Sequence, residues 1–218
     1  MIIDCISDLH GFYPELQGGD LLIVAGDLTA RDTPEQYHQF IDWISSQRYK
    51  RKIFIAGNHD NIIFKHGGVL KIYQEADSSV QYLCDSGTEF EGLKIWGSPW
   101  SLWFPGINPH CTAFTGSEEE LIDKWEKIPD EVDILVTHTP PHGIMDANFQ
   151  EKHCGSKGLL GQLIYRIRPF LHVFGHIHED YGQRETMACR EGKRMHSVNA
   201  SVVNERYEQV NKPIRIEL

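Results

Sequence analysis

The sequence predicts an α/β fold, in which short buried strands alternate with amphipathic helices. Short runs of apolar and β-branched residues bounded by glycine recur along the chain, and such runs are typical of buried strands. Segments with capping residues and the apolar spacing of helices lie among them. At 218 residues the chain is long enough for one substantial core, so we expect a single domain over residues 1–218.

The predicted strands are five apolar runs, each followed by a residue that binds hard metal ions. The runs are 2–7, followed by Asp8, Leu9 and His10; 21–26, followed by Asp27; 53–57, followed by Asn58, His59 and Asp60; 134–137, followed by His138; and 173–175, followed by His176, Ile177 and His178. Ligands of open α/β sheets gather where such strands end. The five runs together therefore predict one site assembled from distant parts of the chain.

Three helices are predicted from their N-caps, which are Thr33, Ser117 and Ser156. Gln36 and Glu120 stand at the capping-box positions of the first two helices, and Pro34 is the first residue of the first helix. The residues expected to face the core are Tyr37, Phe40, Ile41 and Ile44; then Leu121, Ile122 and Trp125; then Leu159, Leu160, Leu163, Ile164 and Ile167.

The remaining segments have weaker patterns. Residues 80–97 predict short strands with a turn at 85–87. Residues 98–116 and 139–157 are expected to be long loops, because they are rich in proline, glycine, aromatic residues and histidine. Long loops inside a compact domain are usually functional or mobile.

Composition and charge exclude several classes of protein. The formal charge of −10 argues against broad nucleic-acid binding, but not against phosphate substrates, because bound metal ions reverse the local field. No apolar stretch approaches the length of a membrane span, and no signal peptide is visible. The five cysteines are scattered and form no Cys-x-x-Cys pair, which favours reduced thiols in a cytoplasmic protein.

The residues that follow the strands offer only nitrogen and oxygen ligands. Such a set suits Mn, Fe, Zn, Co or Mg better than a structural zinc–cysteine site. In an extended strand residues i and i+2 point the same way, so Asp8 and His10 can bind one ion, and His176 and His178 can bind one or two ions from another strand. Single residues also have structural interpretations: Asp27 as a turn residue or helix N-cap, Asn58 in a left-handed turn, and His138 as a core histidine.

The ordered set resembles the signature of the calcineurin-like metallophosphoesterases. The resemblance rests on Asp8-Leu9-His10, Gly26-Asp27, Gly57-Asn58-His59-Asp60, His138 and Gly175-His176-Ile177-His178. The stretches Gly26-Asp27-Leu28-Thr29 and Val198-Asn199-Ala200-Ser201 are similar to the metallophosphoesterase-domain-containing proteins, which are related to class III cyclic-nucleotide phosphodiesterases. The resemblance implies a four-layer α/β/β/α sandwich.

The resemblance also implies a two-metal site, with manganese favoured, in which a bridging hydroxide attacks a phosphoester. One ion would be held by Asp8, His10, Asp27 and His178, and the other by Asp27, Asn58, His138 and His176. His59 would be the catalytic histidine that faces the phosphate. Asn58, His59 and His142 are the predicted substrate contacts.

The expected substrate is a phosphodiester, such as a cyclic nucleotide, with a phosphomonoester, a phosphoprotein or a non-catalytic scaffold role as alternatives. Protein phosphatases of this superfamily have an aspartate where Ala30 stands, which weakens that alternative. Asp60, beside His59, is a candidate replacement for that carboxylate. Four aromatic residues are either a stacking wall for a nucleobase or packing under a loop: Trp96, Trp100, Trp103 and Phe104.

Overall fold

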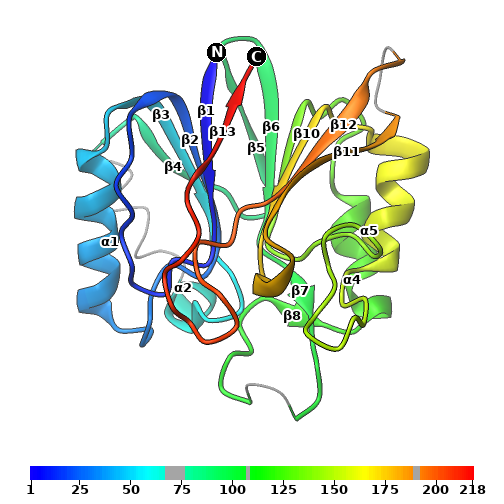
Figure 1. Ribbon diagram of the computed structural model, residues 1–218, viewed down its shortest axis with the longest axis horizontal. Helices are drawn as coiled ribbons and strands as arrows, with labels where there is room; N and C mark the ends of the chain where they lie inside the picture. Colours follow the sequence, from blue (N-terminus) through cyan, green and yellow to red (C-terminus); the bar gives the residue numbers. More distant parts are fainter. Residues whose placement is uncertain (67–76, 107–108, 189–191) are drawn as a thin grey trace.

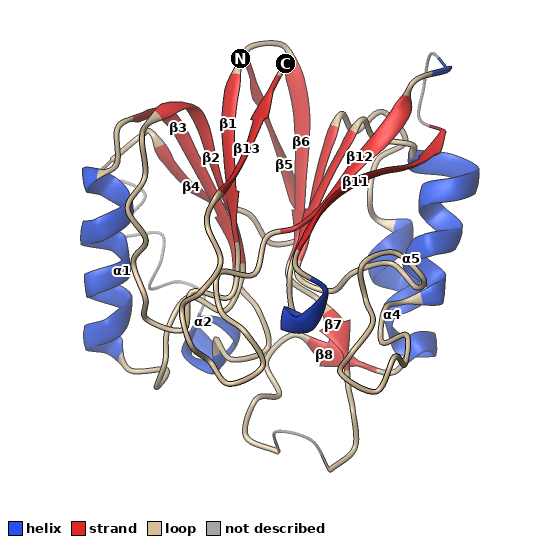
Figure 2. Ribbon diagram, in the orientation of Figure 1, coloured by secondary structure: helices blue, strands red, loops and turns tan. Residues whose placement is uncertain are grey.

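Two mixed β-sheets pack face to face, with helices on both outer faces (Figure 1). The computed structural model describes residues 1–66, 77–106, 109–188 and 192–218. Helix α1 (Pro34–Ser46) covers one sheet, and α4 (Glu118–Glu126) and α5 (Lys157–Gln162) cover the other (Figure 2). The arrangement confirms the predicted four-layer α/β/β/α sandwich.

The first sheet has the strand order β13-β1-β2-β3-β4. Its strands are β1 (Ile2–Ile6), β2 (Gly19–Ala25), β3 (Tyr49–Ile55), β4 (Val80–Tyr82) and β13 (Ile214–Glu217). Strands β1 to β4 are parallel, and β13 pairs with β1 in the antiparallel direction. The carboxyl ends of β1, β2 and β3 therefore lie at one edge of the sheet.

The second sheet has the order β11-β12-β10-β9-β6-β5. Its strands are β5 (Ser86–Phe90), β6 (Leu93–Ser98), β9 (Ile134–Thr137), β10 (Leu171–Phe174), β11 (Gly182–Ala188) and β12 (Arg194–Asn199). The inner strands β6, β9, β10 and β12 are parallel. The five runs predicted as strands are thus β1, β2, β3, β9 and β10.

Three apolar cores separate the four layers. Phe40 and Ile44 of α1 pack on Val24 and Phe54 of the first sheet. Residues of opposite parity on the same strands, such as Ile3, Ile23 and Ile53, pack between the two sheets with Ile134 and Val173. The third core centres on Trp125 of α4, which is fully buried with Leu135 and Leu159. Because both faces of the central strands are covered, apolar residues predominate in them.

The helix starts agree with the sequence in most details. Thr33 caps α1 by accepting from the backbone of Gln36, but the Gln36 side chain binds the N–H of Arg31 rather than closing a capping box. Ser117 and Glu120 form the predicted capping box of α4. Ser156 caps α5, as expected.

Some details differ from expectation. Ile122 and Ile164 are 45% and 37% exposed, because each stands beside its helix's buried face. The third helix continues after Gln162 as the π-helical turn η1 (Leu163–Ile167). The chain bends at Asp85, but the other two predicted turn residues belong to β5, and the hairpin turn lies at Glu91 and Gly92, both with positive φ.

The two predicted long loops contain little regular structure. The first includes β7 (Ser101–Leu102) and β8 (Thr115–Gly116), which pair with each other. The second is closed by bridges between Pro141 and Ser156 and between Ala147 and His153. Both loops, with helix α2 (Asn61–His66), lie at the end of the sandwich opposite the termini (Figure 1).

Candidate metal centre

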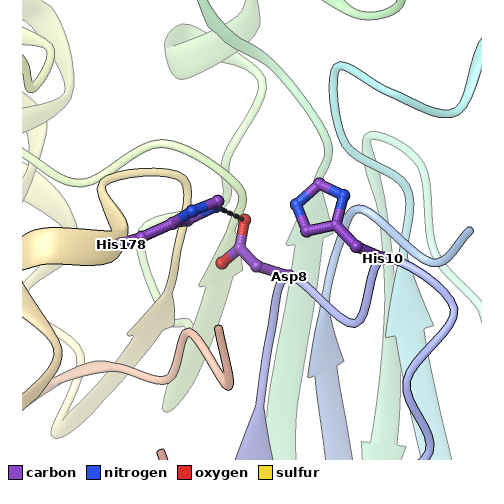
Figure 3. A group of neighbouring side chains, drawn as sticks. All are labelled: Asp8, His10 and His178. Carbon is purple, nitrogen blue, oxygen red and sulfur yellow. Dashed lines mark hydrogen bonds and ion pairs between the residues drawn. The ribbon is translucent and has the colours of Figure 1, made fainter. Parts of the chain in front are cut away.

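Asp8, His10 and His178 form the first group of side chains at the strand ends. One ligand atom from each lies within 4.8 Å of the others. Figure 3 shows the imidazoles of His10 and His178 on either side of the Asp8 carboxylate. Nε2 of His178 is 3.2 Å from Oδ1 of Asp8. Residues 168 or more positions apart in sequence therefore meet because β1 and β10 end at the same place.

Asp27 links this group to a second one. Its Oδ2 is 3.7 Å from Nε2 of His10 and 3.4 Å from Nε2 of His138. The amide oxygen of Asn58 lies 3.0 Å from Nε2 of His138 and 3.0 Å from Nδ1 of His176. The structure thus brings all seven predicted ligands together, with Asp27 between the two groups.

The backbone around these residues is not the extended strand that the i, i+2 argument assumed. Strand β1 ends at Ile6, and Asp8 and His10 have φ of 53° and 42°. Asp27 and His176 have φ of 53° and 71°. Left-handed residues turn the chain sharply, and aspartate and histidine tolerate this region better than most residues. The side chains therefore converge through tight loops rather than through strand alternation, which corrects that expectation.

The hydrogen bonds of the histidines test whether the residues fit metal ions. Nδ1 of His138 lies 2.9 Å from the carbonyl of Ala25, and Nδ1 of His178 lies 3.1 Å from the carbonyl of Asn204. Each Nδ1–H donates to its carbonyl. Each ring, when neutral, therefore directs the lone pair of its Nε2 at a carboxylate oxygen, which also has lone pairs. Such outward anchoring is typical of metal-bound histidine.

A buried atom of His10 points to the same conclusion. Its Nε2 is buried and makes no hydrogen bond with any of the described residues. Buried polar atoms normally have a partner, so an orphaned nitrogen facing carboxylates requires an explanation. A cation between these atoms satisfies the lone pairs and the carboxylates together. The residues therefore fit divalent ions.

The electrostatics of the centre support this fit. Burial lowers the pKa of His10 to about 4 and the pKa of His176 to about 3, so both rings are neutral near pH 7. For His138, burial is outweighed by the charge of Asp27, which raises its pKa to about 9. Metal ions compete with protons for such nitrogens. The centre thus attracts a positive charge where the Asp27 carboxylate faces His138.

His59 lies at the edge of the centre. Its backbone N–H donates to Oδ1 of Asp27 over 2.9 Å, and its Nε2 is 3.9 Å from Oδ2 of the same residue. The side chain is 18% exposed, unlike the fully buried His138. His59 is close enough to His10 and Asp27 to be counted in a candidate metal group. Its predicted role as a non-ligand catalytic histidine stays a prediction.

The Asn199–Ser201 stretch supports the first group. Oγ of Ser201 donates to Oδ2 of Asp8 over 2.6 Å, and the Asn199 amide donates to the carbonyls of Met145 and Ile177. Gly175 packs directly against this carboxylate, since a Cβ there would lie 2.0 Å from Oδ2 of Asp8. These contacts hold the carboxylate in one orientation.

The family model for calcineurin-like phosphoesterases matches residues 1–180, which include every predicted ligand. The chain belongs to the calcineurin-like phosphoesterase family. Family membership, with the Asp and His groups, indicates a phosphoric ester hydrolase that uses divalent metal ions.

Named relatives agree with this family. Metallophosphoesterase domain-containing protein 1 of Homo sapiens is 38% identical over 237 residues, which cover 98% of this chain and 70% of that protein. UPF0046 protein C25E10.12 of Caenorhabditis elegans is 37% identical over 200 residues, covering 82% and 69%. The crystal structure of TT1561 of Thermus thermophilus shares the fold, with a TM-score of 0.64, 16% identity and coverage of 91% and 88%.

The suggestion that Asp60 orients His59 is wrong for this calcineurin-like domain. The Asp60 carboxylate accepts from the backbone N–H groups of Leu28 and Gly57 and from the hydroxyl of Tyr37. It therefore ties the loop after β2 to the loop after β3. Nδ1 of His59 instead faces Sγ of Cys111, 3.4 Å away.

The aromatic loop residues divide between packing and the centre. Trp96 and Trp100 pack against the third core, and the indole N–H of Trp100 donates to Asp85. Trp103 is 52% exposed. Among the described residues, Phe104 is the one of these four aromatic residues that stacks on a candidate ligand. Its ring centroid lies 6.2 Å from that of His176.

His142 has its ring beside His153, with ring centroids 5.3 Å apart, inside its own loop. The backbone of the same loop is fixed by Asp146, whose carboxylate accepts from the N–H groups of Gly143 and Gly155. The predicted substrate contact of His142 stays a prediction.

Tyr207 is a residue at the centre that the sequence patterns did not single out. Its ring lies edge-on to His10 and His178, at centroid distances of 4.8 and 5.4 Å. It belongs to a tight C-terminal turn in which Oδ1 of Asn204 accepts from the backbone of Arg206 and Glu208. The only sequence signal was an asparagine that favours such turns. The turn brings an aromatic ring beside two histidines distant in sequence.

Metal binding is expected to stabilise the folded protein. At a free Mn²⁺ concentration about 100 times the dissociation constant, the gain is about 2.7 kcal/mol, which raises the melting temperature by roughly 5–10 °C in a domain of this size. Calorimetry of chelator-treated protein with and without Mn²⁺ measures the shift. Asp8→Asn should lose most of it, while Asp20→Asn, at the other end of β2 from the centre, should keep it. An unchanged melting temperature with Mn, Zn, Fe, Co and Mg would contradict metal binding.

Proposed function

We propose that this chain is a metal-dependent phosphodiesterase that hydrolyses phosphodiesters, including cyclic nucleotides, at a centre for two divalent ions, with Mn²⁺ as the favoured metal. The observation that carries the proposal is the pair of nitrogen and oxygen groups that meet at Asp27, with His59 beside them. Two-metal hydrolysis needs two ions held close together, and a carboxylate shared by two ligand groups would hold them so.

The positions of the side chains suggest which ligands each of the two ions would have. One ion would be held by Asp8, His10, Asp27 and His178, and the other by Asp27, Asn58, His138 and His176. When bound, the ions supply Lewis-acid activation and neutralise the negative charge of the phosphoester. The seven ligands contribute two negative charges, from Asp8 and Asp27, so two divalent ions leave the centre positive by about 2.

His59 is placed to handle the proton of the leaving group. Its backbone N–H donates to Asp27, which fixes the main chain of His59 at the edge of the centre. Its Nε2 lies 3.9 Å from Oδ2 of Asp27, and its side chain is 18% exposed, in contrast to the buried Asp27 and His138. An imidazole at this place can donate a proton to the departing ester oxygen or a hydrogen bond to a phosphoryl oxygen. General acid catalysis of this kind contributes roughly 10²–10⁴-fold.

The aromatic rings beside the centre favour a diester over a monoester. A diester has a second ester group, which needs a surface to lie against. Tyr207, 40% exposed, lies beside His10 and His178, and Phe104 lies beside His176. Aromatic rings bind nucleobases by stacking. A nucleotide ester therefore has both a place for its phosphate and rings for its base.

The remaining proposals concern the cellular location and the partner of the protein. In the described residues, no helix is long and apolar enough to span a membrane. Cys5, Cys84, Cys111 and Cys154 are free thiols, and Cys189 lies outside the described residues. We keep a reducing, cytoplasmic location and a small phosphoester partner as part of the proposal, since free thiols are typical of that compartment.

Hydrolysis of a defined substrate set tests the proposal. Metal-free protein is reconstituted with Mn²⁺ and assayed with bis-p-nitrophenyl phosphate, p-nitrophenyl phosphate and cyclic nucleotides. The proposal expects turnover of diesters above monoester, lost on chelation and restored by metal. A preference for p-nitrophenyl phosphate would replace the diesterase by a monoesterase. Turnover of no ester, with metal bound, would favour a non-catalytic scaffold.

Tyr207→Ala is expected to raise KM for a nucleotide diester roughly 10-fold, because stacking of a base on an aromatic ring contributes about 1–3 kcal/mol. The KM for a dimethyl or other small alkyl diester should change little, since it has no ring to stack. Tyr207→Phe keeps the ring and should keep the wild-type KM. Tyr165→Ala, which removes a tyrosine 79% exposed on η1, serves as the control. An equal change in KM for both substrates would refute stacking on Tyr207.

A further inference from the structure

The sulfur of Cys111 lies at the ring nitrogen of His59 that faces away from the centre. Sγ is 3.4 Å from Nδ1, which is within hydrogen-bond range for sulfur. The opposite nitrogen, Nε2, faces Asp27 at 3.9 Å. The ring of His59 therefore stands between the thiol of Cys111 and the carboxylate of Asp27.

Two hydrogen bonds hold the backbone around Cys111 against the loop that carries His59. The N–H of Ala113 donates to the carbonyl of Asn58 over 3.2 Å. The side-chain amide of Asn61 donates to the carbonyl of His110 over 3.2 Å. These bonds lie on either side of Cys111 in sequence and on either side of His59 in the partner loop. The backbone at Cys111 is thus held against the loop of His59 on both sides.

The carboxylates near His59 have other partners. Asp60 accepts from the backbone of Leu28 and Gly57 and from Tyr37. Asp32 accepts from the hydroxyl of Tyr37 and the N–H of Ile62. Among the described residues, the sulfur of Cys111 is the side-chain atom that lies within hydrogen-bond distance of Nδ1 of His59.

We propose that Cys111 is a positioning residue, which holds the ring of His59 with Nε2 directed at the reaction centre. Its effect on catalysis rests on the proposed function, in which His59 assists the leaving group. Burial, with the charges of Asp27 and Asp32, raises the pKa of Cys111 to about 11, so the sulfur keeps its hydrogen. A thiol can donate to Nδ1 of a neutral imidazole and accept from Nδ1–H of a charged one.

An uncharged partner has a chemical consequence. A carboxylate at Nδ1 stabilises the charged imidazole strongly, whereas a thiol holds the ring in place with little electrostatic bias. The ring can then both give and regain its proton during turnover. Removal of the sulfur leaves the ring free to rotate about its side-chain bonds, and groups that orient a functional histidine typically affect activity roughly 10- to 100-fold.

A first experiment measures the position of the ring without any reaction. In selectively labelled protein, ¹³C relaxation of the His59 Cε1–H group gives its order parameter, and a His59→Gln variant assigns the signal. Wild-type protein is expected to give a value typical of a rigid group, about 0.85, and Cys111→Ala a value below about 0.6. Cys111→Ser, which keeps a hydroxyl at this place, should restore order. Cys154→Ala, which removes another partly exposed thiol, should change nothing.

A second experiment measures turnover. We expect Cys111→Ala to lower kcat roughly 10- to 100-fold for a cyclic nucleotide, whose alkoxide leaving group needs a proton. The loss should be smaller for bis-p-nitrophenyl phosphate, whose leaving group is stable without one. KM and bound metal should be unchanged, and Cys111→Ser should recover most of kcat.

The two measurements distinguish failure of the positioning role of Cys111 from failure of the proposed function. A rigid ring in Cys111→Ala would overturn the proposal, whatever happens to turnover. Lost metal in that variant would also overturn it, because Cys111 would then support the ligands rather than His59. If the wild-type protein hydrolyses neither ester, the proposed function fails, and the order parameter alone decides whether Cys111 positions His59.

Discussion

Asp27→Asn is expected to reduce kcat for a phosphodiester by roughly 10³-fold or more while the protein stays folded. The carboxylate of Asp27 faces His10 in one ligand group and His138 in the other, so its loss weakens both. The amide keeps the shape but removes a negative charge and one acceptor oxygen. Because metal ions contribute several kcal/mol of transition-state stabilisation, weak or incomplete metal binding costs about three factors of ten in rate.

The measurement combines turnover with metal analysis of the same preparation. Circular dichroism should show the wild-type fold, since Asp27 contributes no apolar packing. Asp20→Asn makes the same chemical change at the opposite end of β2 from Asp27, where the carboxylate binds Lys50 and the N–H of Ile2, and should leave kcat unchanged. Wild-type turnover and metal content in Asp27→Asn would exclude the shared-ligand role.

His59→Ala is expected to lower kcat about 10²- to 10⁴-fold, the range for loss of general acid–base assistance, with both metal ions retained. The ring lies at the partly accessible edge of the centre, so its removal leaves the buried ligands in place. The loss should grow as the leaving group becomes a poorer one. Metal content, measured alongside turnover, distinguishes a catalytic residue from a ligand.

The control for this variant is His196→Ala. His196 lies in β12, three residues before Asn199, and its ring binds the side chain of Gln183 at the exposed surface rather than any candidate ligand. Turnover should stay at the wild-type value. Loss of one metal ion per protein molecule in His59→Ala would instead identify His59 as a ligand. The distance between His59 and Asp27 is compatible with that role.

The parts of the fold that depend on short stretches of sequence were predictable. The capping box of Ser117 and Glu120 and the apolar face of α1 follow from residues three or four positions apart. The candidate ligands were predictable for a related reason, because each lies within four residues after the end of a buried strand, and parallel strands end together. The order of those ligands also carried the resemblance to the family that the comparisons confirm.

The residues that surround the ligands were not predictable in the same way. Ser201 reaches Asp8 across 193 positions, and Cys111 reaches His59 across 52. Their neighbours in sequence give no sign of these contacts, since the contacts depend on how loops after different strands meet. Tyr207 lies in a turn beyond the segment that the family model matches. Local patterns describe strands and caps, but contacts between loops require the three-dimensional arrangement.

The left-handed backbone of the ligands has a thermodynamic consequence. Asp8, His10, Asp27 and His176 each occupy a region that costs of order 1–3 kcal/mol when it persists in a folded protein, with aspartate and histidine nearer the lower end. Glycine would relax each loop but would remove a ligand. At these positions, a substitution that stabilises the metal-free protein would therefore weaken its binding of metal ions. Selection for thermal stability alone would tend to erase the centre, whereas selection for hydrolysis keeps a domain that is less stable than its cores would allow.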